Sequence, residues 1–488
     1  MATPIPKNDC EFSLAEAQRA TGGRLVGDGN AIARGVCTDS RIVEPRMLFV
    51  ALSGERFDGH KHVARAMASG AAAAIVAKSH DEAVPRIEVG DTLVALGDLA
   101  RNHLERLRKQ REIRSVAIGG ASGKTTTKEL TAAALRALFG KVMATPGNLN
   151  NRIGVPMTLF TLKDRDRAMV IECGTNKRGE IEKIASIVAP DVAMVLNVDI
   201  EHTEGLGSIE AVADEEAALF GYAREAIVWG ADEPLLKERL PQTLRAISFG
   251  QSEASDVRVV AYRPTNENGG VVGIQLAQKL LKGESSPGIE VALQLAGSTS
   301  ALNCAAALAA TIAALGRSIS YDELKAMSAA LGQVPPVEGR MVILRAGSIK
   351  VIDDSYNANP RSVRAALRTA REMANRGGSR LVVALGDMLE LGDLSRESHH
   401  EMIADVADAN PAVFIAVGPC TGVAAIESAD MLSNTCEVVI AEDSSEAAMK
   451  VSEIARPGDL VLIKGSRGVG MEALVTRLKT PSNEPSFS

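Results

Sequence analysis

The sequence has no closely paired cysteines, since its six cysteines are scattered singly through 488 residues without a Cys-x-x-Cys pair. In so long a chain this distribution indicates reduced thiols and argues against a disulfide framework or a zinc site. The sequence also lacks an excess of positive charge, because its formal net charge is −7. A nucleic-acid or anionic-membrane partner is therefore not expected.

Long apolar runs are missing as well. No stretch of 18 consecutive apolar residues occurs, so we expect no membrane span. The first residues, MATPIPKNDCEF, lack the charged-then-apolar layout of a secretory signal peptide. Together with the reduced cysteines, these features predict a cytoplasmic protein.

The chain does have length and an ordinary globular composition, with 46% apolar residues. At about 150 residues per domain, its length suggests about three domains. Strand-like and helical stretches alternate in residues 1–108, 109–338 and 339–488, the last two divided by a Gly/Pro-rich linker. The charged helix RNHLERLRKQREIR is expected to be a solvated connector. The polar tail, about 480–488, is expected to be disordered.

The segment GGASGKTTTKEL, residues 119–130, has the composition of a phosphate-binding loop between a strand and a helix. Its glycines let backbone N–H groups approach phosphate oxygens, and the helix start adds partial positive charge. Lys124 is expected to reach the β- and γ-phosphates of ATP, and the Thr125 hydroxyl to ligate Mg²⁺. The commoner nucleotide loop has a further glycine where this chain has Ile118. A plain glycine-rich turn is the alternative.

Two further apolar runs of this domain, RAMVIECG and DVAMVLNVD, predict strands of a buried parallel sheet. They deliver Glu172 and Asn197, followed by His202, to the carboxyl edge of the sheet, where ligands bind in such folds. A carboxylate beside a triphosphate is a natural Mg²⁺ ligand. His202 is less obvious as a ligand, because Mg²⁺ prefers oxygen. Taken alone, a loop histidine is more often a surface or capping residue.

Eight segments in one order resemble the Mur ligase family. They are ASGKTTTKEL, TPGNLNNRIGVP, IECGTNKRGEI, NVDIEHTEGLGS, EGRM, DDSYNANPRSVRAAL, LGDMLELGDLSRESHH and VLIKGSRGVGMEAL. The resemblance covers nearly the whole chain, and the short Gly-x-x-Gly-Lys-Thr loop is the family's version. It implies a small N-terminal α/β domain that grips a UDP-sugar, a central parallel-sheet ATPase domain and a C-terminal Rossmann-like α/β domain.

The resemblance also implies an activity: ATP phosphorylates a substrate carboxylate, and an amine then attacks the acyl phosphate. The expected substrates are UDP-MurNAc-tripeptide and D-alanyl-D-alanine, with ATP and Mg²⁺ as cofactors and a monomeric enzyme. By similarity, Thr125 and Glu172 hold a first Mg²⁺, and His202 contributes to a second. The implied nucleotide-binding residues are Gly120, Ala121, Ser122, Gly123, Lys124, Thr125, Thr126, Asn303, Arg340, Asp354, Tyr356, Asn357 and Asn359.

The acceptor substrate is assigned residues in two places by the same resemblance. The N-terminal motifs TDSR and GERFDGHKHV supply Ser40, Arg41, Phe57, Asp58 and His60, some of which can be purely structural. Asn148, Asn150 and Asn151 in GNLNN are expected to face the muramyl-peptide side of the cleft. For His399, a capping or packing role is as plausible as a catalytic one.

The sequence departs from the family pattern at three positions. Glu216 stands where many members have a lysine whose carbamate helps to hold the second Mg²⁺. A glutamate is roughly three bonds shorter, at about 1.2–1.5 Å per bond, so the helix must shift inward, a water must bridge, or the metal is held more loosely. We hypothesise that Glu216 replaces the carbamate functionally. Thr299 replaces a frequent histidine, and Gly119 a usual threonine.

These departures leave other functions open. A Mur-like paralogue with a different amine or acceptor is one, including a ligase for single amino acids. A degenerate homologue that only binds nucleotide is another, although Lys124, Thr125, Glu172 and His202 are all present. A generic P-loop kinase or GTPase fits less well, because the loop spacing is wrong. The third residue of the accepted peptide, diaminopimelate or lysine, does not follow from the sequence.

Overall fold

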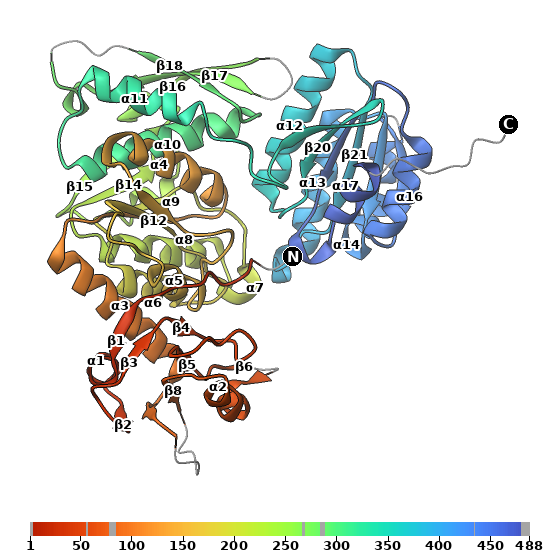
Figure 1. Ribbon diagram of the computed structural model, residues 1–488. Coiled ribbons are helices and arrows are strands. Elements are labelled where there is room, and N and C mark those ends of the chain that lie inside the picture. Colours follow the sequence, from red (N-terminus) through yellow and green to blue (C-terminus); the bar gives the residue numbers. More distant parts are fainter. Residues whose placement is uncertain are drawn as a thin grey trace.

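The computed structural model describes residues 3–54, 57–77, 84–265, 269–283, 288–433 and 435–479. Figure 1 shows three α/β domains: the N-terminal one below the central one, and the C-terminal one beside it. Each domain has its own principal sheet, of five, nine and six strands in chain order. The three-domain α/β fold is thereby confirmed. The predicted tail at 480–488 lies outside the described residues.

The N-terminal domain is a small mixed sheet in the order β2-β9-β8-β5-β4, with two short ribbons, β1-β3 and β6-β7. Its first helix, α1, begins with a capping box, in which the Ser13 and Glu16 side chains bond each other's backbone N–H groups. Its elements are β1 Glu11–Ser13, α1 Leu14–Thr21, β2 Arg24–Val26, β3 Ile32–Arg34, β4 Val36–Cys37, β5 Leu48–Val50, β6 Ser53–Gly54, β7 Phe57–Asp58, η1 Gly59–His62, α2 Val63–Ala68, β8 Ala73–Val76 and β9 Arg86–Glu88.

The charged segment expected to be a solvated helical connector, residues 101–114, is helical up to Gln110 as the end of α3, Thr92–Gln110, but the expectation that it is solvated is wrong. Leu99, Leu104 and Leu107 on this helix are buried. α3 packs against α1 of the N-terminal domain and against two helices of the central domain, α5 (Gly154–Leu159) and α6 (Glu180–Val188). The charged residues occupy the opposite face, which is usual for an amphipathic helix. The domain boundary predicted at 108/109 falls within α3 and stays a prediction.

The central sheet has the order β11-β12-β10-β13-β14-β15-β16-β17-β18. Its strands from β11 to β16 are parallel, as predicted, and β16, β17 and β18 add an antiparallel edge. β10 therefore lies between β12 and β13. The strands are β10 Arg114–Gly119, β11 Val142–Ala144, β12 Ala168–Glu172, β13 Val192–Val195, β14 Ala226–Gly230, β15 Arg245–Gly250, β16 Val257–Pro264, β17 Gly270–Leu276 and β18 Ile289–Leu293.

Helices cover both faces of this sheet, so successive side chains of β10 are buried on opposite faces. Val116 and Ile118 face α4, α10 and α11, whereas Ala117 faces α5, α6 and α8. The helices are α4 Lys124–Phe139, α5 Gly154–Leu159, α6 Glu180–Val188, α7 Thr203–Leu206, α8 Ile209–Ala217, η2 Ala218–Tyr222, α9 Pro234–Lys237, η3 Gln278–Leu280, α10 Ser298–Leu315 and α11 Tyr321–Leu331. Among the described residues, α10 alone is long and apolar enough to cross a membrane. Of its residues, 72% are buried, and the helix packs against α4 and the sheet.

The C-terminal sheet has the order β19-β20-β24-β21-β22-β23, antiparallel only at β19-β20. α12 and α13 pack on one face, and α16 and α17 on the other. Its elements are β19 Val342–Ala346, β20 Ile349–Asp354, α12 Pro360–Gly377, β21 Leu381–Gly386, η4 Gly392–Leu394, α13 Ser395–Ala409, β22 Val413–Val417, α14 Pro419–Glu427, α15 Ala429–Leu432, β23 Glu437–Ala441, α16 Ser444–Ile454, β24 Leu460–Lys464, η5 Arg467–Val469 and α17 Glu472–Lys479.

Candidate active site

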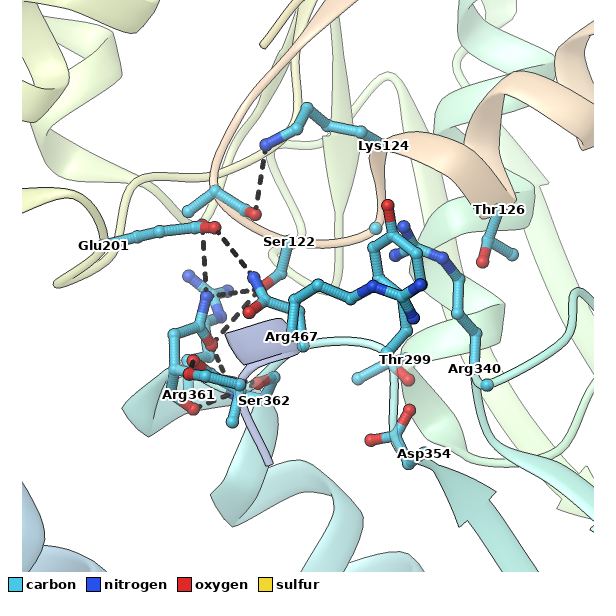
Figure 2. Close-up of a pocket in the computed structure, with 18 of the residues that line it drawn as sticks. Ser122, Lys124, Thr126, Glu201, Thr299, Arg340, Asp354, Arg361, Ser362 and Arg467 are labelled. Carbon is cyan, nitrogen blue, oxygen red and sulfur yellow. Dashed lines mark hydrogen bonds between the residues drawn. The ribbon is translucent and has the colours of Figure 1, made fainter. Parts of the chain in front are cut away.

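A cavity of about 690 Å³ lies between the central and C-terminal domains. Figure 2 shows polar side chains from both domains converging in it, among them Ser122, Lys124 and Glu201 from the central domain and Asp354 and Arg361 from the C-terminal domain. The carboxyl ends of β10, β12 and β13 open into it, as expected for a parallel sheet.

The predicted phosphate loop forms the tight connection between β10 and α4. Gly120 and Gly123 have φ angles of 117° and 89°, in the region that favours glycine. A Cβ on Gly123 would lie 2.5 Å from Oδ1 of Asn303, so that this asparagine can approach the loop only because residue 123 is a glycine. Asn197 fixes the loop from β13: its Oδ1 accepts from the Ser122 N–H at 2.8 Å, and its Nδ2 donates to the Ser122 carbonyl at 2.9 Å.

Lys124 begins α4 and reaches back over the loop. Its ammonium donates to the carbonyl oxygens of Gly120, at 2.5 Å, and Ala121, at 3.3 Å. Burial alone would lower the pKa of Lys124, but the carboxylates of Glu201, Glu216 and Glu172 outweigh burial and raise it. The side chain is therefore a fixed positive charge at the loop.

Glu172 ends β12 and is 2% exposed. Its Oε2 accepts from the Thr125 hydroxyl at 3.0 Å, and its Oε1 accepts from Nδ2 of Asn150, also at 3.0 Å. Lys128, which the sequence analysis missed, is fully buried one turn after Lys124, with its ammonium 4.0 Å from Glu172 and 2.7 Å from the Thr145 carbonyl oxygen. The sequence feature that could have indicated Lys128 is its spacing in GKTTTKEL, four residues after Lys124 and therefore on the same face of the helix.

Glu201 is the second residue that the sequence analysis missed, although it precedes His202. It is 7% exposed, and its oxygens accept from the amides of two residues of the C-terminal domain, Asn357 and Asn359, each at 3.3 Å. Asn359 Nδ2 also donates to the Ser122 hydroxyl at 2.9 Å, while its Oδ1 caps α12. The predicted asparagine-rich turn thus contacts both the phosphate loop and the central domain.

Glu216 lies on α8 and points at the start of the loop, where its Oε2 accepts from the Gly120 N–H at 2.5 Å. A Cβ on Gly119 would come within 2.6 Å of the same oxygen. Two departures from the family pattern are therefore sterically linked, because the missing side chain at 119 leaves room for the carboxylate of 216. Burial raises the pKa of Glu216, with Lys124 and the Gly120 N–H opposing the rise.

His202 is the N-cap residue that precedes α7, with a φ of 56°, and its Nδ1 lies 2.5 Å from Oε2 of Glu390 on the C-terminal domain. Its Nε2 lies 3.4 Å from Oε1 of Glu201. Burial opposes the charged imidazole, but the hydrogen bond that His202 donates to Glu390 and the charge of Glu201 together raise the pKa of His202. His202 does occupy the N-cap position of α7, as one alternative had it, but its side chain makes no helix-capping bond and contacts Glu390 instead.

The donor set around the loop fits a hard divalent cation. Glu172, Glu201 and Glu216 are all buried, and their charges act on one ammonium, that of Lys124. Lys128 offsets part of the charge on Glu172. Buried negative charge in excess of buried positive charge is unfavourable, and Mg²⁺ takes oxygen ligands. Carboxylate and hydroxyl oxygens are available here beside a phosphate-type loop.

The other predicted nucleotide residues also line the cavity. The Arg340 guanidinium lies 4.1 Å from the centre of the Tyr356 ring, and the Arg467 guanidinium lies 5.3 Å from it. Asp354 accepts from the ammonium of Lys464 at 2.6 Å and from the Met341 N–H at 3.0 Å. Thr126, Thr299 and Asn303 complete this end. Lys464 and Arg467 were not predicted, because nothing in their local spacing marks them as partners of residues more than a hundred positions away.

The predicted acceptor residues are divided between two places. Asn148, Asn150 and Asn151 line the cavity, whereas Ser40, Arg41, Phe57, Asp58 and His60 lie on the N-terminal domain and are not among its lining residues.

Within the N-terminal domain, Nδ1 of His60 lies 2.7 Å from Oδ1 of Asp58, and Nε2 of His60 accepts from the Ala77 N–H at 2.9 Å. The Asp58–His60 pair therefore stabilises loops of its own domain. Arg41 pairs with Asp39 and Phe57 is 56% exposed, which leaves the surfaces of both accessible. His399 is buried in the C-terminal domain, where its Nδ1 donates to the Ser395 carbonyl and its Nε2 accepts from the Met388 N–H.

Comparison with known proteins gives one consistent result. Three family models match in order along the chain: "Mur ligase family, catalytic domain" over residues 33–104, "Mur ligase middle domain" over 118–311, and "Mur ligase, glutamate ligase domain" over 339–467. The UDP-N-acetylmuramoyl-tripeptide–D-alanyl-D-alanine ligase of Escherichia coli K12 is 34% identical over 449 residues, covering 91% of this chain and 93% of the relative.

The ligase of the same name from Bacillus subtilis 168 is 31% identical, covering 92% of this chain and 93% of its own. Among solved structures, a crystal structure of MurF from Acinetobacter baumannii superposes with a TM-score of 0.85 at 29% identity, covering 97% of this chain and 99% of that one. The phosphate loop, the interdomain cavity and these matches over more than nine tenths of the chain lead to one conclusion: this chain belongs to the Mur ligase family.

Proposed function

We propose that this protein is an ATP-dependent ligase that joins D-alanyl-D-alanine to UDP-MurNAc-tripeptide, the last cytoplasmic step of UDP-MurNAc-pentapeptide synthesis for peptidoglycan. The observation that carries the proposal is the convergence of Lys124, Glu172, Glu201 and His202 in one cavity between two domains. The names of its relatives in two distantly related bacteria support the choice of substrates.

The reaction has two steps. A carboxylate oxygen of the tripeptide attacks the γ-phosphorus of ATP, and the bond to ADP breaks to leave an acyl phosphate. The amine of D-alanyl-D-alanine then attacks the acyl carbon, phosphate leaves, and the nitrogen loses a proton. Both steps bring several anions together, so their rate depends on positioning and on fixed positive charge.

The nucleotide is assigned to the loop and to the C-terminal domain. Backbone N–H groups of residues 120–126 and the ammonium of Lys124 bind the phosphates. Asn303, which packs against Gly123, would bind the base. Arg340, Asp354 and Tyr356 approach from the other domain with Asn357 and Asn359, so docking of that domain completes the site.

Mg²⁺ is assigned to the buried oxygens beside the loop. Thr125 and Glu172, which are already bonded to one another, would hold one ion, and His202 and Glu216 would contribute to a second. Bound there, Mg²⁺ neutralises charge on the transferring phosphoryl group. Glu201 is an additional candidate ligand, since its buried side chain lies 3.4 Å from Nε2 of His202.

The acceptor is assigned to the opposite side of the loop. Asn148, Asn150 and Asn151 would face the muramyl peptide, and Asn150 links that surface to Glu172. Ser40, Arg41 and Phe57 would grip the UDP-sugar from the N-terminal domain, with Asp58 and His60 holding the loop that carries Phe57.

The decisive experiment measures phosphate release from ATP by the purified protein with UDP-MurNAc-tripeptide, with D-alanyl-D-alanine added or withheld. Release that depends on the dipeptide supports the proposal. Release stimulated better by a single amino acid would indicate a sister ligase. The absence of release with every amine, despite nucleotide binding, would indicate a homologue that only binds nucleotide.

A further inference from the structure

Two loops from different domains meet beside the candidate metal ligands. Residues 202–204 of the central domain lie against residues 390–392 of the C-terminal domain, joined by three bonds. His202 Nδ1 lies 2.5 Å from Glu390 Oε2, the Thr203 hydroxyl donates to the Leu391 carbonyl at 2.9 Å, and the Glu204 N–H donates to the Glu390 carbonyl at 3.1 Å. We call these two loops the interdomain latch.

The backbone of the latch is shaped for this contact. His202 and Glu390 have φ angles of 56° and 64°, which non-glycine residues adopt only at a cost. A Cβ on Gly392 would lie 3.0 Å from the Glu204 Cα, so glycine permits the close approach of the loops. Both unusual residues bond to each other, which points to a selected geometry rather than a chance surface contact.

The bond fixes the tautomer of His202. A carboxylate oxygen accepts hydrogen bonds, so the 2.5 Å contact with Oε2 of Glu390 makes Nδ1 of His202 the donor. Nε2 is left facing Glu201, 3.4 Å away. Histidine ligands of metals characteristically donate their second ring N–H to a carboxylate, which fixes the orientation of the ring.

We propose that Glu390 is a positioning residue that couples docking of the C-terminal domain to the orientation of His202, so that the second cation site is complete only in the docked arrangement. The neighbouring ligand candidate is tied to the same event, because Glu201 is held by Asn357 and Asn359 of that domain. Withdrawal of the C-terminal domain removes the partner of His202 and both amide donors of Glu201 together.

This inference rests on the proposed function for the identity of the cation, but its test does not require ligase activity. The variants are Glu390→Ala, which removes the acceptor, and Glu390→Gln, which keeps a neutral one. Glu397→Gln is the matched control, since Glu397 is exposed nearby on α13, outside the latch and the cavity. One readout is the Mg²⁺ concentration that half-saturates binding of a fluorescent ATP analogue. The other is the radius of gyration of the nucleotide-free protein by small-angle X-ray scattering.

Loss of a partner behind a metal ligand typically weakens metal affinity by about 10–100-fold. We therefore expect Glu390→Ala to raise the half-saturating Mg²⁺ concentration roughly tenfold and to increase the radius of gyration, with Glu390→Gln between it and the control. Values equal to those of Glu397→Gln in both measurements would overturn the inference. A larger radius of gyration with an unchanged Mg²⁺ requirement would also overturn it, because the Glu390 carboxylate would then hold the two domains together without affecting the cation site. The dipeptide-dependent phosphate release of the unmodified protein decides the proposed function separately.

Discussion

The steric link between Gly119 and Glu216 makes Gly119→Ala an informative substitution. The added Cβ would lie 2.6 Å from Oε2 of Glu216, whereas ordinary contact begins at 3.4 Å, so the carboxylate must retreat by the difference, 0.8 Å. Its bond to the Gly120 N–H is 2.5 Å long. A retreat of this size takes the bond out to the limit of hydrogen-bonding distance.

A hydrogen bond to a charged group contributes about 1.5–3 kcal/mol. In a domain of 150–250 residues, each kcal/mol lowers the melting temperature by roughly 2–4 °C. We expect Gly119→Ala to lower the first melting transition in scanning calorimetry by several degrees. The φ angle of Gly119 is not in the left-handed region, so backbone strain does not contribute.

Gly221→Ala is the matched control, because a Cβ at Gly221 meets nothing within 4 Å. It corrects for the general effect of Gly→Ala on the unfolded chain, about 0.4–1 kcal/mol. The double variant Gly119→Ala/Glu216→Asp shortens the carboxylate by one bond, about 1.5 Å, and should recover part of the loss. The steric argument is wrong if Gly119→Ala has the same melting temperature as the control. It is also wrong if the double variant loses as much melting temperature as its two single substitutions together.

Three other outcomes are expected. Lys124→Met should reduce phosphate release by about 10²–10³-fold, the cost of one lost charge-stabilising donor; residual release within tenfold of the unmodified protein would exclude its role. Glu216→Ala should raise the Mg²⁺ requirement of the reaction strongly, and an unchanged Mg²⁺ titration would rule that role out. Burial lowers the pKa of His103 to about 4 from an ordinary 6.5. As the pH drops, the unfolded chain therefore binds the proton at a higher pH than the folded protein does. The free energy of unfolding falls by about 1.4 kcal/mol per pH unit between pH 6.5 and 4. His103→Leu should flatten that part of the profile of melting temperature against pH, and a parallel profile would contradict the assignment.

The sequence by itself determined the phosphate loop and the residues at the strand ends. A strand, a glycine-rich turn and a helix are local patterns, and in a parallel sheet the residues that end neighbouring strands must meet at one edge. Glu172 and Asn197 could therefore be assigned from the sequence to the same sheet edge as the phosphate loop, and the structure shows that they lie next to it, since β12 and β13 flank β10. The predicted asparagines and Arg340 rested on the ordered motifs of the family instead.

Only the tertiary structure decided which charges face each other across the domains. Glu390 meets His202 from 188 positions away, and Lys464 meets Asp354 from 110. Periodicity reports which face of an element is buried but not which element from another domain covers it. For the same reason the sequence did not predict that one face of α3 is buried between two domains. Nor did it predict that the carboxylate of Glu216 lies against Gly119.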